Sequence, residues 1–254
     1  MIKVCIAGCT GWVGKELVKV VLNNKKEFEL TGAVSRKSAG DKIGDVIIHS
    51  TIEEALKIKT DVLIDYTHPN IVKKHILFAI KQKVNVVVGT SGLTDKDYKE
   101  IDTIAKKYNV GVIPSGNFSI TASLQQYFSI IASQYISNFE IVDYAWPTKP
   151  DAPSGTANEL ASKLRKIKKP TVGYPIEKII GDKKARGSST HDIQIHSVRL
   201  PGYKFNIESL FGLEGERLII KAEAMETAMP YIAGTLLAAQ KIIKHKGIKN
   251  WSII

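Results

Sequence analysis

The sequence predicts an α/β protein that has a Rossmann-type, doubly wound parallel sheet and a second α/β domain with a mixed or antiparallel sheet. In the first 117 residues, short and almost wholly apolar segments alternate with amphipathic segments. That alternation is typical of parallel strands that helices cover on both faces. A glycine-rich turn follows the first of these strands. After residue 117, strand-like segments succeed one another with short connections, which favours antiparallel pairing.

In the first half, apolar runs are expected to be strands, and segments with an apolar face at helical spacing are expected to be helices. The expected strands are residues 2–7, 28–35, 61–66, 84–88 and 110–114. The expected helices are residues 15–22, 70–81 and 95–108, with a short helix opened by a capping-box pattern at 51–54. Strand 84–88 is so apolar that it should be buried on both faces.

In the second half, a proline-rich loop at residues 147–153 and a hairpin turn at 213–216 separate the expected elements. The expected helices are residues 119–136, about 155–166, and 228–243. The expected strands are residues 140–144, 191–199, 206–211 and 217–223. The change of pattern near residue 117 therefore marks the start of a second domain.

The composition limits the class of protein and of partner. With 36 Lys and Arg against 25 Asp and Glu, the 254-residue chain has a net charge of +11, which suits anionic partners. No nucleic-acid motif accompanies the basic residues, so we expect a lysine-rich solvated surface that binds neither nucleic acid nor membrane. The apolar runs are too short for a transmembrane helix, and the first residues lack the pattern of a signal peptide. Cys5 and Cys9 form neither a disulfide framework nor a convincing metal site, so we expect a cytoplasmic protein without a metal.

The first chemical motif is the turn after strand 2–7, where three glycines occur with the spacing Gly-x-x-Gly-x-x-Gly. Between a strand and a helix, such glycines let the backbone approach a pyrophosphate at the helix N-terminus. The residues expected to bind a dinucleotide here are Gly8, Thr10, Gly11, Trp12, Val13 and Gly14. The alternative is that the glycines serve only a tight turn.

The residues after strand 28–35 indicate which dinucleotide fits. Sites that prefer NAD usually place Asp or Glu there to bind the ribose 2′-hydroxyl. This chain has Arg36 and Lys37 instead, and two cations would pair with a 2′-phosphate. We therefore expect NADPH as cofactor, with NADH possible. The alternative is that both cations lie on a solvated loop.

A second motif, Lys149-Pro-Asp-Ala-Pro-Ser-Gly-Thr-Ala157, closely resembles the substrate-binding signature of the 4-hydroxy-tetrahydrodipicolinate reductase (dihydrodipicolinate reductase) family of lysine biosynthesis. The resemblance spans nearly the whole chain, because further family motifs occur in order. They lie at residues 8–14, 65–67, 89–92, 117–119 and 195–199, and in the Gly-Glu-Arg strand from residue 215. The resemblance implies a dinucleotide-binding domain of residues 1–117, completed by 225–254, and a substrate-binding and oligomerisation domain of residues 118–224. It also implies a homotetramer.

The same resemblance implies roles for individual residues. Ser154, Gly155 and Thr156 open a helix after the proline-rich loop, so their amides and hydroxyls can bind a substrate carboxylate. Lys149 would contact the substrate and take part in protonation. The positions implied to line the nicotinamide and the domain hinge are Tyr66, Thr67, Gly89, Thr90, Ser91, Asn117 and Phe118. For the last two, ordinary hinge packing is an equal alternative.

The chain departs from the family where the family has histidines. Ala145 and Trp146 stand at the positions of the general acid and of a substrate ligand, and Ile207 and Ala222 align with two further histidines. Neither alanine nor indole donates a proton near neutral pH. Ala145 and Trp146 are still expected to contact the substrate. Lys149 becomes the expected catalytic proton donor, with water or Tyr144 as alternatives.

The sequence is compatible with three functions. In the first, the protein is an NADPH-dependent reductase that transfers hydride to the C=N bond of the family's cyclic imine carboxylate. In the second, the four replaced positions build a less polar pocket for a different cyclic imine. In the third, the protein is a non-catalytic regulatory homologue that binds NADP. The presence of both the glycine turn and the carboxylate pocket favours an enzyme.

Overall fold

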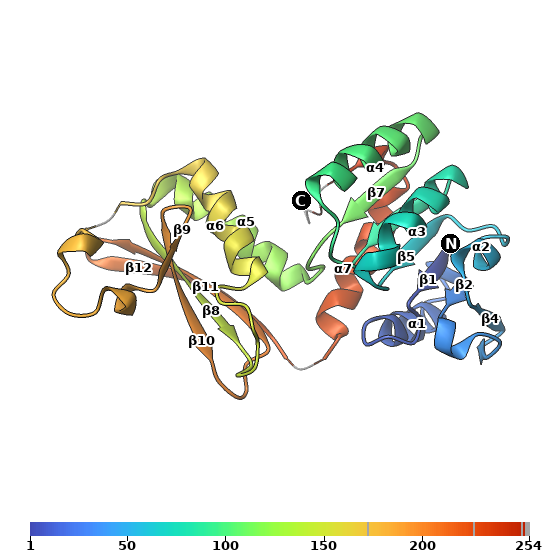
Figure 1. The fold of residues 1–254 in the computed structure, drawn as a ribbon, viewed down its shortest axis with the longest axis horizontal. Coiled ribbons are helices and arrows are strands. Elements are labelled where there is room, and N and C mark those ends of the chain that lie inside the picture. Colours follow the sequence, from blue (N-terminus) through green and yellow to red (C-terminus); the bar gives the residue numbers. More distant parts are fainter. Residues whose placement is uncertain (172, 226, 250, 252–254) are drawn as a thin grey trace. The chain divides into compact units, whose positions relative to one another are not determined.

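The computed structural model describes residues 1–171, 173–225, 227–249 and 251. The chain divides into two compact units, one of residues 1–119 with 228–254 and the other of residues 120–227 (Figure 1). The first unit has a mainly parallel sheet and the second has a mixed sheet. The predicted α/β fold class is therefore confirmed. The expected domain limits, 117/118 and 224/225, lie within three residues of the limits of these units.

The sheet of the first unit has the strand order β13-β7-β6-β5-β1-β2-β4-β3. Its pairs are parallel except for β3 with β4, which is antiparallel. Because β2 and β5 flank β1 on opposite sides, the chain reverses its direction of winding at β1. The strands are β1 (Ile2–Ala7), β2 (Phe28–Val34), β3 (Lys42–Ile43), β4 (Val46–His49), β5 (Val62–Asp65), β6 (Asn85–Val88), β7 (Gly111–Pro114) and β13 (Gly247–Ile248).

Helices bury both faces of this sheet, as the apolar strands predict. Successive residues of β1 point to opposite faces, so Val4 and Ile6 lie in one core cluster and Cys5 and Ala7 in the other. The helices of the first cluster are α1 (Gly14–Asn23) and α7 (Met229–Ile242). The helices of the second cluster are α2 (Ile52–Ala55), α3 (Pro69–Lys81) and α4 (Asp95–Tyr108).

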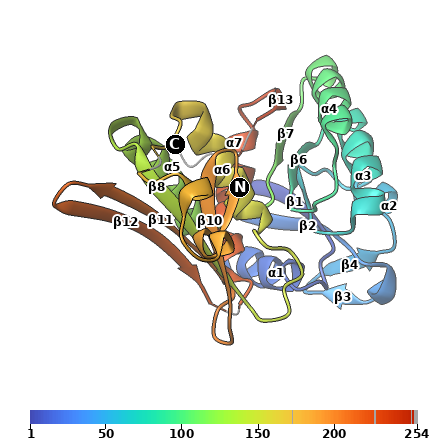
Figure 2. The same ribbon diagram turned by 60° about the vertical axis from the view of Figure 1, so that its left-hand side comes forward.

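The second unit has a mixed sheet with the order β12-β11-β8-β10-β9. Strands β8 and β10 are parallel, and the other neighbours are antiparallel. Two helices, α5 (Ile120–Tyr135) and α6 (Gly155–Ile167), pack on the sheet through one core cluster (Figure 2). The strands are β8 (Asn138–Ala145), β9 (Ser188–Thr190), β10 (Ile193–Arg199), β11 (Phe205–Leu213) and β12 (Glu216–Ala224).

The structure differs from the expected elements mainly at short strands. β3, β4, β9 and β13 were not expected. Each has only two to four residues and is defined by its pairing with a neighbouring strand. The strand expected at 191–199 begins only at Ile193. His191 and Asp192 form a turn before it, with φ angles of 53° and 63° in the left-handed region.

Candidate active site

The turn after β1 is as tight as its glycines predict. Gly8 has a φ of +82°, and a Cβ on it would lie 2.2 Å from the carbonyl oxygen of Tyr66. A Cβ on Gly14 would lie 2.0 Å from the carbonyl oxygen of Gly8. Steric contact within the chain itself therefore requires glycine at both positions. For this reason, the glycines alone do not separate dinucleotide binding from a simple turn.

The start of α1 does favour an anion. Val13 occupies the N-cap position and, within the described residues, supplies no side-chain hydrogen bond to the helix. The helix dipole at such an end attracts a phosphate group. The amides of Lys15 and Glu16 already donate to the carbonyls of Gly11 and Val13. Trp12 is 47% exposed beside this end, and its ring contacts Tyr231 of α7 edge-to-face at 5.8 Å between centroids. The residues present therefore fit a pyrophosphate.

The two expected cations follow directly after β2. Arg36 and Lys37 lie in the 3-10 helix η1 (Arg36–Ser38), and both are exposed. A hydrogen bond of 2.8 Å between the hydroxyls of Thr10 and Ser35 joins this segment to the glycine turn. The cations therefore lie at the carboxyl end of the strand next to β1, where the ribose of a dinucleotide is bound in this class of fold.

The loops after β5 and β6 contact each other closely. A Cβ on Gly89 would lie 2.2 Å from the ring of Tyr66. The hydroxyl of Tyr66 makes a 2.7 Å hydrogen bond with the hydroxyl of Thr235 on α7, and burial raises the pKa of Tyr66. The backbone amide of Thr67 donates a 2.8 Å hydrogen bond to the Thr90 hydroxyl. Ser91 follows as an exposed residue.

Asn117 and Phe118 are held by packing contacts of the first unit. The Asn117 side-chain oxygen accepts a 2.8 Å hydrogen bond from the amide of Ser119. Phe118 is 1% exposed and contacts the rings of Tyr66 and Trp251 at centroid distances of 6.5 and 5.3 Å. These contacts favour the packing alternative for Phe118.

In the second unit, the start of α6 is open on one side. The Ser154 hydroxyl caps the helix by accepting a 3.2 Å hydrogen bond from the amide of Ala157, so it is occupied. Gly155 is exposed, and a Cβ on it would meet nothing within 4 Å. Thr156 is half-buried beside it. The backbone amide of Gly155 already hydrogen-bonds a carboxylate of the chain itself, that of Asp151, and helps to lower its pKa. This end of the helix is therefore suited to carboxylate binding.

A buried ion pair that sequence reasoning missed holds this helix start in place. Asp143 of β8 is 3% exposed. Its Oδ2 accepts hydrogen bonds from the amide of Ser154 at 2.9 Å and from the guanidinium of Arg199 at 2.8 Å. The same guanidinium donates a 2.8 Å hydrogen bond to the carbonyl oxygen of Asp151. Asp143 and Arg199 are 56 residues apart in the chain, so no local sequence pattern predicts the pair.

Lys149 lies between a carboxylate and an indole. Its ammonium forms an ion pair with Asp151, and the hydrogen bond from Lys149 holds the pKa of Asp151 below its usual value. The Nζ atoms of Lys149 and Lys204 lie 5.4 and 5.2 Å from the ring centroid of Trp146. The ring of Phe205 meets the same indole edge-to-face at 5.4 Å. Trp146 therefore lies in a cationic environment, although a less polar one was one of the expectations.

The other positions where the family has histidines are buried away from this indole. Ala145 is 1% exposed, whereas Trp146 is half-buried. Ile207 and Ala222 pair directly across β11 and β12 and belong to the core cluster under α5 and α6. The structure therefore does not bring Ile207 and Ala222 together with Trp146 on one open surface, and the hypothesis of a shared pocket loses its support.

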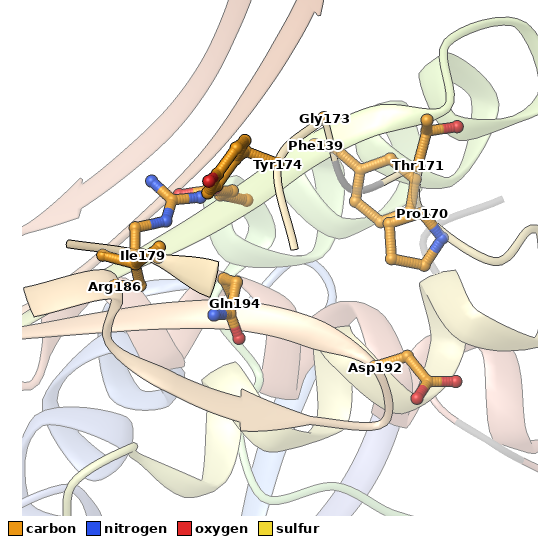
Figure 3. Close-up of a pocket in the computed structure, with 10 residues that line it drawn as sticks. Phe139, Pro170, Thr171, Gly173, Tyr174, Ile179, Arg186, Asp192 and Gln194 are labelled. Carbon is orange, nitrogen blue, oxygen red and sulfur yellow. The ribbon is translucent and has the colours of Figure 1, made fainter. Parts of the chain in front are cut away.

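A hollow of about 430 Å³ lies elsewhere in the second unit. Figure 3 shows its lining residues, which come from the start of β8, from the connection that follows α6, and from Asp192 and Gln194 at the start of β10. Those of the connection are Pro170, Thr171, Gly173, Tyr174, Ile179 and Arg186. Phe139, at its edge, is six residues before Ala145 on the same strand, which corresponds to about 20 Å. The hollow contains none of the expected site residues.

Among the residues that the structure describes, we looked for groups of metal ligands and for membrane-spanning helices. There, no group of three or more His, Cys, Asp and Glu side chains is placed to hold a metal ion. Over the same residues, no helix has the length and apolar character needed to cross a membrane.

Comparisons with known proteins agree over nearly the full chain. Residues 2–118 match the family model for the N-terminus of dihydrodipicolinate reductase, and residues 119–252 match the model for its C-terminus. The 4-hydroxy-tetrahydrodipicolinate reductase of Bacillus licheniformis is 37% identical, over 96% of this chain and 93% of that protein. The 4-hydroxy-tetrahydrodipicolinate reductase of Bacillus subtilis is 34% identical, again over 96% of this chain and 93% of that protein. A solved structure, dipicolinate-bound dihydrodipicolinate reductase from Paenisporosarcina sp. TG-14, is 30% identical with a TM-score of 0.88, covering 98% of this chain and 97% of that one.

Proposed function

The chain belongs to the dihydrodipicolinate reductase family, and on that premise we propose that it is an NADPH-dependent reductase of 4-hydroxy-tetrahydrodipicolinate. The observation that carries the proposal is the match of both family models, which together span residues 2–252. The reaction is the transfer of hydride to the C=N bond of a cyclic imine carboxylate.

The first unit is proposed to bind the cofactor. The open start of α1 would hold the pyrophosphate, and Arg36 with Lys37 would pair with the 2′-phosphate. The residues proposed to contact the nicotinamide half are Tyr66, Thr67, Gly89, Thr90 and Ser91. The bound cofactor supplies the hydride. The exposed position of Arg36 and Lys37 at the carboxyl end of β2 supports the choice of NADPH over NADH.

The second unit is proposed to bind the substrate. The exposed amide end of α6 at Gly155 and the hydroxyl of Thr156 would hold a substrate carboxylate. Hydride adds to the carbon of the C=N bond, and the π electrons of that bond become a lone pair on nitrogen. For a neutral imine, the ammonium of Lys149 then gives the nitrogen a proton and regains one from solvent. The ion pair with Asp151 supports this role because it holds the ammonium in one place.

A second candidate is a reductase of a different cyclic imine, and Trp146 is the observation that favours it. An indole with two lysine ammoniums beside it differs in size and charge from the imidazole that the family has there. Such a site would still accept an anionic substrate, but it would select for another ring. The third candidate, a regulatory protein that binds NADP, requires both ligand sites to be retained without turnover.

One set of assays separates the three candidates. NADPH oxidation is followed with 4-hydroxy-tetrahydrodipicolinate and, separately, with 1-piperideine-2-carboxylate. Turnover of the first substrate supports the main proposal, and turnover of only the second supports the other reductase. Tight NADPH binding without turnover of either supports the regulatory protein. Parallel assays with NADH decide the cofactor.

We also propose that the protein is a homotetramer, as the family resemblance implies. Apolar side chains exposed on the second unit support an interface. They include Tyr127, Phe128, Ile131 and Tyr135 of α5 and Leu218 and Ile219 of β12. Sedimentation equilibrium measures the mass directly, and a concentration-independent monomer of 28.0 kDa would contradict the proposal.

A further inference from the structure

A fully buried carboxylate ends strand β5. Asp65 is 0% exposed. Its Oδ1 accepts hydrogen bonds from the amide of Thr67 at 3.0 Å and from the hydroxyls of Thr67 and Thr90, both at 2.7 Å. Its Oδ2 lies 2.7 Å from Nδ1 of His75, a residue of α3 that is itself buried. The three groups at Oδ1 are donors, and His75 is a fourth when its Nδ1 carries the proton, so the surroundings suit an anion.

This carboxylate fixes two loops relative to one helix. Thr67 belongs to the loop after β5, Thr90 to the loop after β6, and His75 to α3. The backbone carbonyl of Asp65 also accepts a 2.9 Å hydrogen bond from the amide of Gly89. The Asp65 side chain therefore adds to the direct contacts that hold the two loops together. An uncompensated charge at this depth would be strongly destabilising, and these hydrogen bonds offset that cost for Asp65.

The loops in question face the reactive end of the proposed cofactor. In a doubly wound sheet the dinucleotide lies across the carboxyl ends of the strands, with its pyrophosphate at the first turn. Here β2 and its cations lie on one side of β1, and β5 and β6 lie on the other. The nicotinamide half must then extend over the loops after β5 and β6. This step rests on the proposed function.

We propose that the buried Asp65 carboxylate, held by His75, favours the oxidised cofactor over the reduced one and so sets the reduction potential of the bound couple. The oxidised nicotinamide ring carries a positive charge and the reduced ring carries none. A fixed negative charge in a buried environment therefore stabilises only the oxidised ring. It also stabilises the positive charge that develops on the ring as the hydride leaves. Asp65 is a positioning residue, since it acts through Thr67 and Thr90 and through its field.

The test compares the affinities of the two cofactor forms. Asp65→Asn keeps the size of the side chain and removes its charge. Titration calorimetry with NADP⁺ and with NADPH should show the ratio of the two affinities shifting about tenfold towards NADPH. That shift corresponds to about 1.4 kcal/mol, the interaction of unit charges about 12 Å apart at an effective dielectric constant near 20. A purely structural role would weaken both forms equally and leave the ratio unchanged.

A matched control removes the same charge at the other end of the same strand. Asp61 precedes β5, and its carboxylate accepts a 2.8 Å hydrogen bond from the amide of Lys3. It lies four residues, or about 13 Å, from Asp65. Asp61→Asn should therefore leave the NADP⁺/NADPH affinity ratio within about twofold of the wild-type value.

A second variant keeps the proposal testable if Asp65→Asn does not fold. His75→Leu removes the partner of Oδ2, and a buried carboxylate left without that partner becomes neutral by protonation. The affinity ratio should then shift towards NADPH, as in Asp65→Asn. An unchanged ratio in the folded His75→Leu variant, or a shift towards NADP⁺, overturns the proposal. If wild-type protein binds neither form, the proposed function itself fails, and that outcome is distinct from an unchanged ratio.

Discussion

The ammonium of Lys149 is held in place by two different neighbours. The carboxylate of Asp151 pairs with it directly, and the indole of Trp146 lies beside it at 5.4 Å. A cation gains from the face of an aromatic ring as well as from an opposite charge. With alanine and tryptophan at the two positions where histidines are expected, this lysine is the titratable group best held beside the start of α6.

We expect Lys149→Ala to lower kcat for the imine substrate by about 10²–10⁴-fold, the usual contribution of a positioned proton donor. The affinity for NADPH should change little. Steady-state kinetics and a separate NADPH titration measure the two effects. Lys166→Ala, which changes an exposed lysine of α6, is the control. An alanine variant at position 149 with undiminished kcat would show that another group supplies the proton.

Arg36 offers a second prediction about a single charge. Arg36→Ala should weaken NADPH binding by about tenfold or more, because a hydrogen bond to a charged group contributes roughly 1.5–3 kcal/mol. NADH binding should stay within about twofold, since NADH has no 2′-phosphate. Fluorescence titration with both cofactors gives the two dissociation constants. Lys25→Ala, an exposed lysine before β2, serves as control, and equal losses for both cofactors would remove the proposed contact.

Among the elements, the ones with strong periodicity are predicted best. The helix expected at residues 95–108 has those bounds in the structure, and Thr94 caps it with a complete capping box. The strand expected at 84–88 lies buried between both core clusters. The two-residue strand β13 was not predicted, because its place beside β7 depends on tertiary contacts with α4.

Some parts of the candidate site can be predicted from the sequence and others cannot, because only some of them are local motifs. The glycine turn and the start of α6 are local motifs, so the sequence places them correctly on a strand–helix turn and on a helix N-terminus. The pair Asp143–Arg199 forms only when segments 56 residues apart fold together. The pair Asp65–His75 joins β5 to the next helix, α3, and depends on how that helix packs on the sheet. The indole of Trp146 was expected to make the substrate pocket less polar. The fold instead brings the ammonium of Lys204 close to it, from the connection between β10 and β11.

Strand β13 is attached both to β7 and to helix α4. Oδ1 of Asp102 on α4 accepts a 2.9 Å hydrogen bond from the amide of Ile248, and its Oδ2 pairs with Lys106. We expect Asp102→Ala to speed hydrogen exchange at the Ile248 amide by about three- to tenfold, since one hydrogen bond of this kind is lost. The amide of Val112, in the neighbouring β7, should keep its protection.

The difference in Ile248 exchange rate between wild type and Asp102→Ala should depend on pH through the pKa of Asp102. The hydrogen bond from Lys106, and then the one from the Ile248 amide, hold this pKa below its usual value. The ionised carboxylate therefore stabilises the attachment at pH values above the unfolded-state pKa, and the effect is lost as the pH falls through the lowered folded-state pKa. Wild type and Asp102→Ala should exchange Ile248 alike below that point. A constant difference at all pH values would contradict the assignment.

The thermal stability of the two units should respond differently to the cofactor. NADPH binds only the first unit in our proposal, and at about one hundred times its dissociation constant it adds about 2.7 kcal/mol to the stability of that unit. Differential scanning calorimetry should therefore show one transition that moves upward with NADPH and one that does not. A shift of both transitions by the same amount would show that the units unfold together.

The first unit is formed by residues from both ends of the chain, 1–119 and 228–254. Ile232, Leu236 and Ile242 of α7 belong to the same core cluster as Ile6 of β1 and Phe118. Each large buried side chain contributes roughly 2–5 kcal/mol, and a whole domain is stable by only about 5–15 kcal/mol. A chain of residues 1–227 lacks α7 and should lose both the folded first unit and NADPH binding.

A chain ending at residue 246 is the matched control for this truncation, because it keeps α7 and removes only β13 and the residues after it. It should retain NADPH binding with a lower melting temperature. Residues 120–227 expressed alone keep their own core cluster, in which Ile141 of β8 and Leu160 and Leu164 of α6 are fully buried, so they should fold without cofactor. Circular dichroism and NADPH titration measure all three fragments. NADPH binding by residues 1–227 with undiminished affinity would mean that α7 packs on a unit that is already complete without it.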